Sequence, residues 1–177
     1  MKNFIHILII GLMLLLCASC KNQRPSPRYQ PWDHKCEATL SGDKVCVPFK
    51  RTMSGLIEVQ VSLNSVPFNM CWDTGAAITS ISSLEYAKLV KEGVACDDDL
   101  SDCITITCAD GSSSDQRTLI IKEIYIQGKD GHYLRLMNVE AIILDNTKAP
   151  LLLGQNVISN LPKHSFNESS MEIEFEK

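Results

Sequence analysis

The residues of this chain best placed to do chemistry are Asp73-Thr74-Gly75, which follow the mostly apolar run of residues 66–72 and precede Ala76-Ala77. That run has the length and character of a β-strand, so the triplet puts a carboxylate at a strand end. A carboxylate held there can take up or release a proton during hydrolysis. The alternative for an isolated Asp-Thr-Gly is a turn aspartate that closes a hairpin. The interpretation therefore depends on the rest of the chain.

A second segment far along the chain supplies that context: Leu152-Leu153-Gly154, which opens into Gln155-Asn156. The order of a strand, Asp-Thr-Gly, small residues and then two large aliphatics with a glycine resembles the retroviral-type (retropepsin-like) aspartic proteases. The resemblance covers roughly residues 45–175. It implies a mostly β fold, a closed barrel with a psi-loop core in which the two motifs cross, a flap hairpin, and one or two short helices.

The resemblance also implies roles for individual residues. Asp73 is the expected catalytic residue, and Thr74, Gly75 and Ala76 support its loop. Leu152, Leu153 and Gly154 form the psi-loop core. The candidate flap, which would cover the substrate, comprises Ala109, Asp110 and Gly111. The family reaction uses no cofactor and no metal, so neither is expected here.

Peptide hydrolysis by carboxylates needs two of them close enough to share a proton, because repulsion lets one be protonated while the other stays ionised. The chain carries one Asp-Thr-Gly. The second carboxylate must then come from another copy, which predicts a homodimer with two Asp73 side chains across a two-fold axis. Within the resemblance, Thr74 hydrogen-bonds the partner's loop and Gly75 brings its backbone amide close to the carboxylate.

The N-terminus predicts export. Lys2 and the following apolar stretch read as a signal peptide over residues 1–19, too short to span a bilayer. Ala18-Ser19-Cys20 is similar to a bacterial lipoprotein cleavage site, although Cys17 stands where such sites usually carry Leu. We therefore expect lipidation of Cys20, a lipid-anchored tether over residues 20–44, and a protease domain over residues 45–177. The predicted location is the cell envelope, facing the periplasm, with an ordinary signal peptide as the alternative.

Composition argues against nucleic-acid binding. The chain has 17 basic and 21 acidic residues, and removal of the signal peptide takes one basic residue and lowers the net charge from −4 to −5. No basic stripe is present. The acidic cluster Asp97-Asp98-Asp99 is expected to be a solvated loop rather than a metal site, because it lacks the spacing and turn glycine of a calcium loop.

Six cysteines remain after Cys17 is removed and Cys20 is modified. An even number in an oxidising compartment predicts disulfides, and Cys36 with Cys46, Cys96 with Cys103 and Cys71 with Cys108 are one possible set among fifteen connectivities. A buried thiol is the alternative for Cys71. Zinc is disfavoured because the chain has no Cys-x-x-Cys.

Strand patterns dominate the rest of the chain. Apolar and polar residues alternate over 56–63, and a turn at Asn64-Ser65 joins this strand to residues 66–72. Ser82 and Glu85 form a capping box for a helix that runs to Glu92 and stops at Gly93. Further strands are expected over 78–81, 104–108, 118–127, 139–144 and 171–175.

These observations predict an exported, lipid-anchored aspartic endopeptidase that acts as a homodimer on peptides or proteins in the cell envelope. Two alternatives remain open. One is a catalytically silent protease fold that grips an extended peptide or an envelope partner by adding a strand. The other is a structural envelope lipoprotein whose β domain docks a partner.

Overall fold

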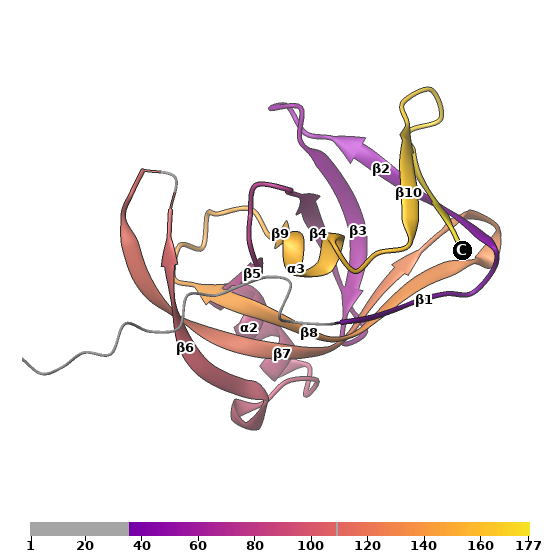
Figure 1. The fold of residues 1–177 in the computed structure, drawn as a ribbon. Helices are drawn as coiled ribbons and strands as arrows, with labels where there is room; N and C mark the ends of the chain where they lie inside the picture. Colours follow the sequence, from indigo (N-terminus) through magenta and orange to yellow (C-terminus); the bar gives the residue numbers. More distant parts are fainter. Residues whose placement is uncertain (1–35, 109) are drawn as a thin grey trace, which may run out of the picture.

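A computed structural model describes residues 36–108 and 110–177, and these residues form a mostly β structure (Figure 1). This confirms the predicted fold class. The described strands join in one eleven-stranded sheet. They are β1 (Glu37–Leu40), β2 (Lys44–Arg51), β3 (Ile57–Leu63), β4 (Val66–Trp72), β5 (Thr79–Ser82), β6 (Leu100–Thr107), β7 (Ser113–Gln127), β8 (Tyr133–Leu144), β9 (Leu152–Leu153), β10 (Lys163–Asn167) and β11 (Glu172–Glu176). Two α-helices, α2 (Ser83–Lys91) and α3 (Gln155–Ile158), and two 3-10 turns, η2 (Asp97–Asp99) and η3 (Lys129–Gly131), accompany them.

The sheet closes into a barrel. Neighbouring strands follow the order β3, β4, β9, β5, β8 and β7, and β7 pairs back onto β3 at Ser62 with Tyr125 and at Leu63 with Ile124. Each of these six strands therefore has a neighbour on both sides over part of its length, and β1 pairs with the part of β8 that β5 leaves open. The predicted closed barrel is therefore present in the structure.

Alternation of apolar side chains explains which face of each barrel strand lies inside. In β3 the side chains of Val59, Val61 and Leu63 are buried, whereas Gln60 between them is exposed. The long strand β8 repeats the pattern with Leu134 and Leu136. Period-two patterning directs these residues to a single interior, and burial of their side chains is the main favourable contribution to folding.

The folded part begins earlier than the predicted domain boundary at residue 45. Strand β1 falls within the predicted tether, yet it pairs antiparallel with β8 from Glu37 opposite Met137 to Leu40 opposite Leu134. Cys36 just before it is buried. A four-residue strand with mixed polarity carries little periodicity, so only its partner strand reveals it. The signal peptide, Cys20 and the tether up to residue 35 lie outside the described residues.

Helix α2 has the predicted ends. The Ser82 side chain accepts a hydrogen bond from the backbone N–H of Leu84, and Glu85 accepts one from the backbone N–H of Ser82, so the capping box is formed. Gly93 follows the helix with φ +71°, a conformation that favours glycine. The helix continues from β5 and therefore fixes the strand that lies beside the Asp73 loop.

The C-terminal hairpin of β10 and β11 packs on the strand that precedes Asp73. The ring of Trp72 lies 5.2 Å from the ring of His164 and 5.5 Å from that of Phe166, both on β10, and 6.3 Å from that of Phe175 on β11. Aromatic rings at these distances interact favourably. His164 thus belongs to an aromatic cluster that holds β4 against the hairpin.

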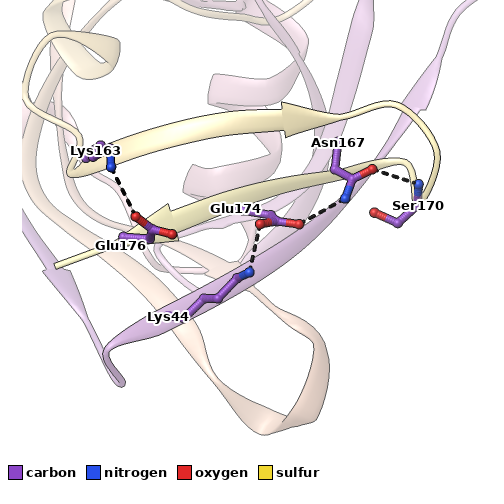
Figure 2. A network of polar contacts seen from close by, with 6 residues as sticks. All are labelled: Lys44, Lys163, Asn167, Ser170, Glu174 and Glu176. Atoms are coloured by element: carbon purple, nitrogen blue, oxygen red, sulfur yellow. Dashed lines mark hydrogen bonds and ion pairs between the residues drawn. The ribbon is translucent and has the colours of Figure 1, made fainter.

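Polar contacts tie the same hairpin to β2, as Figure 2 shows. The Lys44 ammonium on β2 donates to Glu174 on β11 at 2.7 Å. Within the hairpin itself, Asn167 donates to the other oxygen of Glu174 at 3.1 Å, and Lys163 pairs with Glu176 at 3.3 Å. Hydrogen bonding from Lys44 lowers the pKa of Glu174 from its ordinary value. Because these groups are on the surface, where water screens their charges, each contact adds little to stability.

Within the part of the chain that the structure describes, no helix is long and apolar enough to cross a membrane.

Candidate active site

Strand β4 delivers Asp73 to a loop that the second motif holds in place. The short strand β9 lies parallel to β4, with Cys71 opposite Leu152 and Trp72 opposite Leu153. The backbone N–H of Cys71 donates to the carbonyl of Leu151 at 2.7 Å, and that of Asp73 donates to the carbonyl of Leu153 at 3.1 Å. The two motifs therefore lie side by side and share main-chain hydrogen bonds.

The loop itself orients the carboxylate. The backbone N–H of Gly75 donates to Asp73 Oδ1 at 2.8 Å, and that of Ala76 donates to the Asp73 carbonyl at 3.3 Å. A carboxylate oxygen held by a main-chain donor has a defined direction, and the second oxygen is left for other partners. Asp73 is half-buried, whereas Thr74 and Gly75 are exposed on this single chain.

Gly154 is required where the two segments cross. A Cβ at this position would lie 2.4 Å from the carbonyl carbon of Ile78 and 2.7 Å from the nitrogen of Thr79. Beyond the crossing, the backbone N–H of Gln155 donates to the Ala76 carbonyl at 2.8 Å. Its side-chain amide donates to the Thr74 carbonyl at 3.3 Å. The second segment thus supports both ends of the Asp73 loop.

Asn156 is a supporting residue to which the sequence patterns assigned no role. Its side chain is fully buried, and Oδ1 accepts hydrogen bonds from the backbone N–H of Thr79 at 2.8 Å and from the Thr79 hydroxyl at 2.9 Å. Nδ2 donates to the Glu140 carbonyl at 2.7 Å. A buried amide with three partners joins α3, β5 and β8. Its position directly after the Leu-Leu-Gly motif is the sequence feature that could have indicated it.

A cavity of about 750 Å³ opens beside Asp73. Its lining comes from the Asp73 loop, from β5, β8 and β9, and from the end of β6; the residues are Asp73, Gly75, Ala76, Ala77, Ile78, Ser80, Thr105, Ile106, Thr107, Cys108, Ile142, Leu144 and Leu152. Asp73 is the one acidic residue among these described lining residues. The cavity has the size of a site for a small ligand or a few peptide residues, with mostly aliphatic walls.

The β6–β7 hairpin, where the candidate flap lies, projects from the barrel (Figure 1). The last three residues of β6, Thr105, Ile106 and Thr107, line the cavity, and so does Cys108, which follows the strand. Of the predicted flap residues, Ala109 lies outside the described residues, and Asp110 and Gly111 form the exposed turn beyond the cavity. The turn is closed by a hydrogen bond from the backbone N–H of Gly111 to the Cys108 carbonyl at 2.9 Å.

The predicted residues of the Asp73 loop and of the psi-loop core therefore occupy three kinds of position. Asp73, Gly75, Ala76 and Leu152 share one cavity, and Thr74 lies exposed beside them. Leu153 and Gly154 are buried beneath the loop. The described residues contain no group of three or more His, Cys, Asp or Glu side chains that could hold a metal ion.

The predicted disulfides are not formed in the structure. All six cysteines in the described part are free thiols: Cys36, Cys46, Cys71, Cys96, Cys103 and Cys108. Cys36 lies beneath the Asn156 carbonyl, at 3.8 Å, and burial raises the pKa of its thiol to about 11. Cys46 belongs to β2, paired with β11, so the short sequence separation of these two cysteines does not bring them together.

The other expected pairs, Cys96 with Cys103 and Cys71 with Cys108, are not bonded either. The thiol of Cys96, which precedes η2, donates to Asp99 at the end of η2, at 3.6 Å, while Cys103 lies on β6 opposite Arg117. Cys71 is buried, as the alternative prediction had it, and burial raises the pKa of its thiol. Cys108 is exposed at the end of β6.

The chain is similar to known proteins in sequence and in fold. The family model for the gag-polyprotein putative aspartyl protease matches residues 59–160. Among solved structures, a retropepsin-like aspartic protease from Rickettsia conorii is similar, with 14% identity, a TM-score of 0.55, and coverage of 80% of this chain and 96% of that one. The EIAV protease complexed with the inhibitor HBY-793 has 16% identity, a TM-score of 0.41, and coverage of 63% and 92%.

No curated protein matches the chain significantly. At 14% identity the Rickettsia structure shows the fold alone, and that fold is retropepsin-like, as predicted. The family model, in contrast, spans both the Asp73 loop and the segment that crosses it, and it covers more than half of the sequence. The chain therefore belongs to the family of the gag-polyprotein putative aspartyl proteases.

Proposed function

We propose that this protein is an aspartic endopeptidase that works as a homodimer. The observation that carries the proposal is Asp73 itself: its carboxylate is oriented by the Gly75 amide and lines a cavity large enough for several peptide residues. No second carboxylate lines that cavity among the described residues. A hydrolytic site built on two carboxylates is thus half complete in one chain.

A second copy completes it. With two Asp73 side chains across a two-fold axis, one carboxylate takes a proton from the attacking water. The other, protonated, donates to the carbonyl oxygen of the peptide bond as the tetrahedral intermediate forms. Like charges this close cannot both ionise, so the pair shares one proton and divides the two roles. No covalent intermediate is needed.

The surface near Asp73 is suited to self-association. Thr74 and Gly75 are exposed, although the last three residues of the strand before them are buried. Strand β10, which packs on Trp72 through His164 and Phe166, is the outermost strand on its side of the described sheet. An open strand edge with an exposed aromatic side chain is a ready template for another chain. These features support a dimer interface beside the Asp73 loop.

Dilution tests the dimeric site. With a quenched-fluorescent peptide library as substrate, we expect the specific activity to fall once the protein concentration drops below the dimer dissociation constant, because monomers carry half of the site. Sedimentation velocity at the same concentrations reports the fraction of dimer. Specific activity that stays constant where the protein is demonstrably monomeric contradicts the proposal.

We also propose that the enzyme acts in the cell envelope, anchored through a lipid on Cys20. Support comes from the signal-like N-terminus and the small residues that precede this cysteine. Intact-mass analysis of the mature chain should find an acylated N-terminal Cys20, and Cys20→Ala should give an unprocessed or unanchored form. A mature wild-type chain without any acyl group would contradict the anchor and leave the catalytic proposal standing.

A further inference from the structure

The hydroxyl of Ser80 is buried without a partner. Ser80 lies in β5, its residue is 2% exposed, and its Oγ finds no hydrogen-bond partner among the described residues. Buried polar groups in folded proteins are almost always paired, because an unpaired one loses its hydration without compensation. This hydroxyl is the one such side-chain atom in the described part of the chain.

Strand geometry places Ser80 at the cavity. Its neighbours Thr79 and Ile81 point to the other face of β5, where the Thr79 hydroxyl bonds to Asn156 and Ile81 joins the core. Alternation along the strand turns Ser80 the opposite way, and it lines the cavity that contains Asp73. Ser80 is opposite Ile142 on β8 and Leu152 on β9, two further lining residues.

The surroundings of Ser80 combine one hydroxyl with aliphatic walls. Ile78, Ile142 and Leu152 provide apolar surface in the same cavity. The hydroxyl can both donate and accept, and rotation about χ1 moves it between staggered positions without moving the strand. A matching occupant needs a methyl group for the walls and a hydroxyl that reaches Ser80. Threonine has this combination, whereas valine has the same shape and no hydroxyl.

We propose that Ser80 is a specificity-determining residue of this cleft, selecting peptides that place a threonine side chain against Ser80 over peptides with valine there. The inference rests on the proposed function, because it assumes that the cavity receives a peptide. Valine would leave the Ser80 hydroxyl buried and unpaired in the complex, and threonine would pair it.

The test compares cleavage of a randomised octapeptide library by the wild type and by Ser80→Ala, with products identified by mass spectrometry. Because the proposed dimer brings one Ser80 from each copy, we expect the wild type to favour threonine over valine at two positions, one on each side of the cleaved bond, by about threefold to tenfold each, the value of one net hydrogen bond. Ser80→Ala should lose this preference at those two positions alone. Its melting temperature should not fall, because the hydroxyl it removes has no partner.

Thr118→Val is the matched control. Thr118 is a fully buried residue outside the cavity lining, and its hydroxyl donates to the Asp102 carbonyl at 2.8 Å. Removal of this paired hydroxyl should lower the melting temperature and leave the cleavage profile unchanged. A Ser80→Ala protein that loses stability as Thr118→Val does would mean that Ser80 has a structural partner, and would overturn the inference.

A binding measurement separates the inference from the proposed function. The same library is selected on immobilised Asp73→Asn protein, with and without Ser80→Ala. One outcome is that the bound peptides are enriched in threonine, that the enrichment disappears with Ser80→Ala, and that the wild type cleaves no peptide. This outcome supports the role of Ser80 and rejects the protease function. Cleavage with an identical threonine-to-valine ratio in wild type and Ser80→Ala rejects the role of Ser80 alone. If the protein neither binds nor cleaves any peptide of the library, both the role of Ser80 and the proposed protease function are rejected.

Discussion

Asp73→Asn should abolish peptide cleavage while the protein stays folded. Asparagine has nearly the same shape, and its side-chain oxygen can still accept the hydrogen bond that Gly75 donates to Asp73 Oδ1 at 2.8 Å. The amide cannot exchange the proton that hydrolysis requires, so we expect kcat/KM to fall by at least about a thousandfold. Library cleavage measures the loss, and circular dichroism with thermal unfolding verifies the fold.

Asp98→Asn provides the matched control. Asp98 is an exposed residue of η2, outside the cavity lining, so the same chemical change there should leave kcat/KM unchanged. Equal losses in both variants would point to a general effect of charge. Full cleavage by Asp73→Asn would reject the aspartic mechanism altogether.

Mixing the variant with wild type tests whether two Asp73 side chains form one site. If subunits exchange freely, nine parts of Asp73→Asn to one part of wild type leave about a tenth of the wild-type chains in wild-type dimers, by mass action. Activity per wild-type chain should fall to a similar extent, since a mixed dimer lacks one of the carboxylates that share the proton. Activity that is indifferent to the added variant would mean that one chain suffices.

Local features of the fold were predictable from sequence because their causes are local. The capping box of Ser82 and Glu85 and the stop at Gly93 act within one helix, and the structure has both. Alternation over β3 likewise reports which side chains face the interior. Such patterns depend on neighbours within a few residues, so no knowledge of the partner strands is required.

Features created by distant partners were not predictable in the same way. Strand β1 forms because β8 offers it an edge. Strand β10 forms by pairing with β11, with Lys163 opposite Glu176. Strands β7 and β8 begin several residues earlier in the chain than predicted. The two strands keep pairing with each other where the alternation of apolar and polar residues weakens. Pairing energy, not side-chain pattern, sets these limits.

The candidate site likewise combines residues that local sequence predicts with residues whose roles depend on distant partners. Asp73 and Gly154 could be recognised from their motifs, but the partners of Asn156 and the unpaired hydroxyl of Ser80 depend on contacts between separate segments. Short sequence separation is also a weak guide for the cysteines: Cys36 precedes β1, which pairs with β8, whereas Cys46 lies on β2, which pairs with β11, and both are free thiols in the structure. Residues that act through tertiary contacts become visible only once the chain is folded.

Gly154→Ala should disrupt the crossing on which the Asp73 loop depends. The added Cβ would meet the backbone of Ile78 and Thr79 at 2.4 to 2.7 Å. Backbone atoms cannot move aside as a flexible side chain would, so the crossing segments must separate, and the hydrogen bond from Gln155 to the Ala76 carbonyl must lengthen. We expect the free energy of unfolding in urea to fall by about 3 kcal/mol or more, together with loss of cleavage.

Gly55→Ala distinguishes this steric effect from the general loss of a glycine. Gly55 lies in a turn with φ +83°, and a Cβ added there would have no described atom within 4 Å, so alanine meets strain in the backbone and no clash. That strain costs about 1 to 2 kcal/mol. If Gly154→Ala is destabilised no more than Gly55→Ala, the close crossing of the two motifs is absent in solution. A larger loss at Gly154, with activity retained by Gly55→Ala, ties the integrity of the candidate site to the packing of one glycine against the Ile78 backbone.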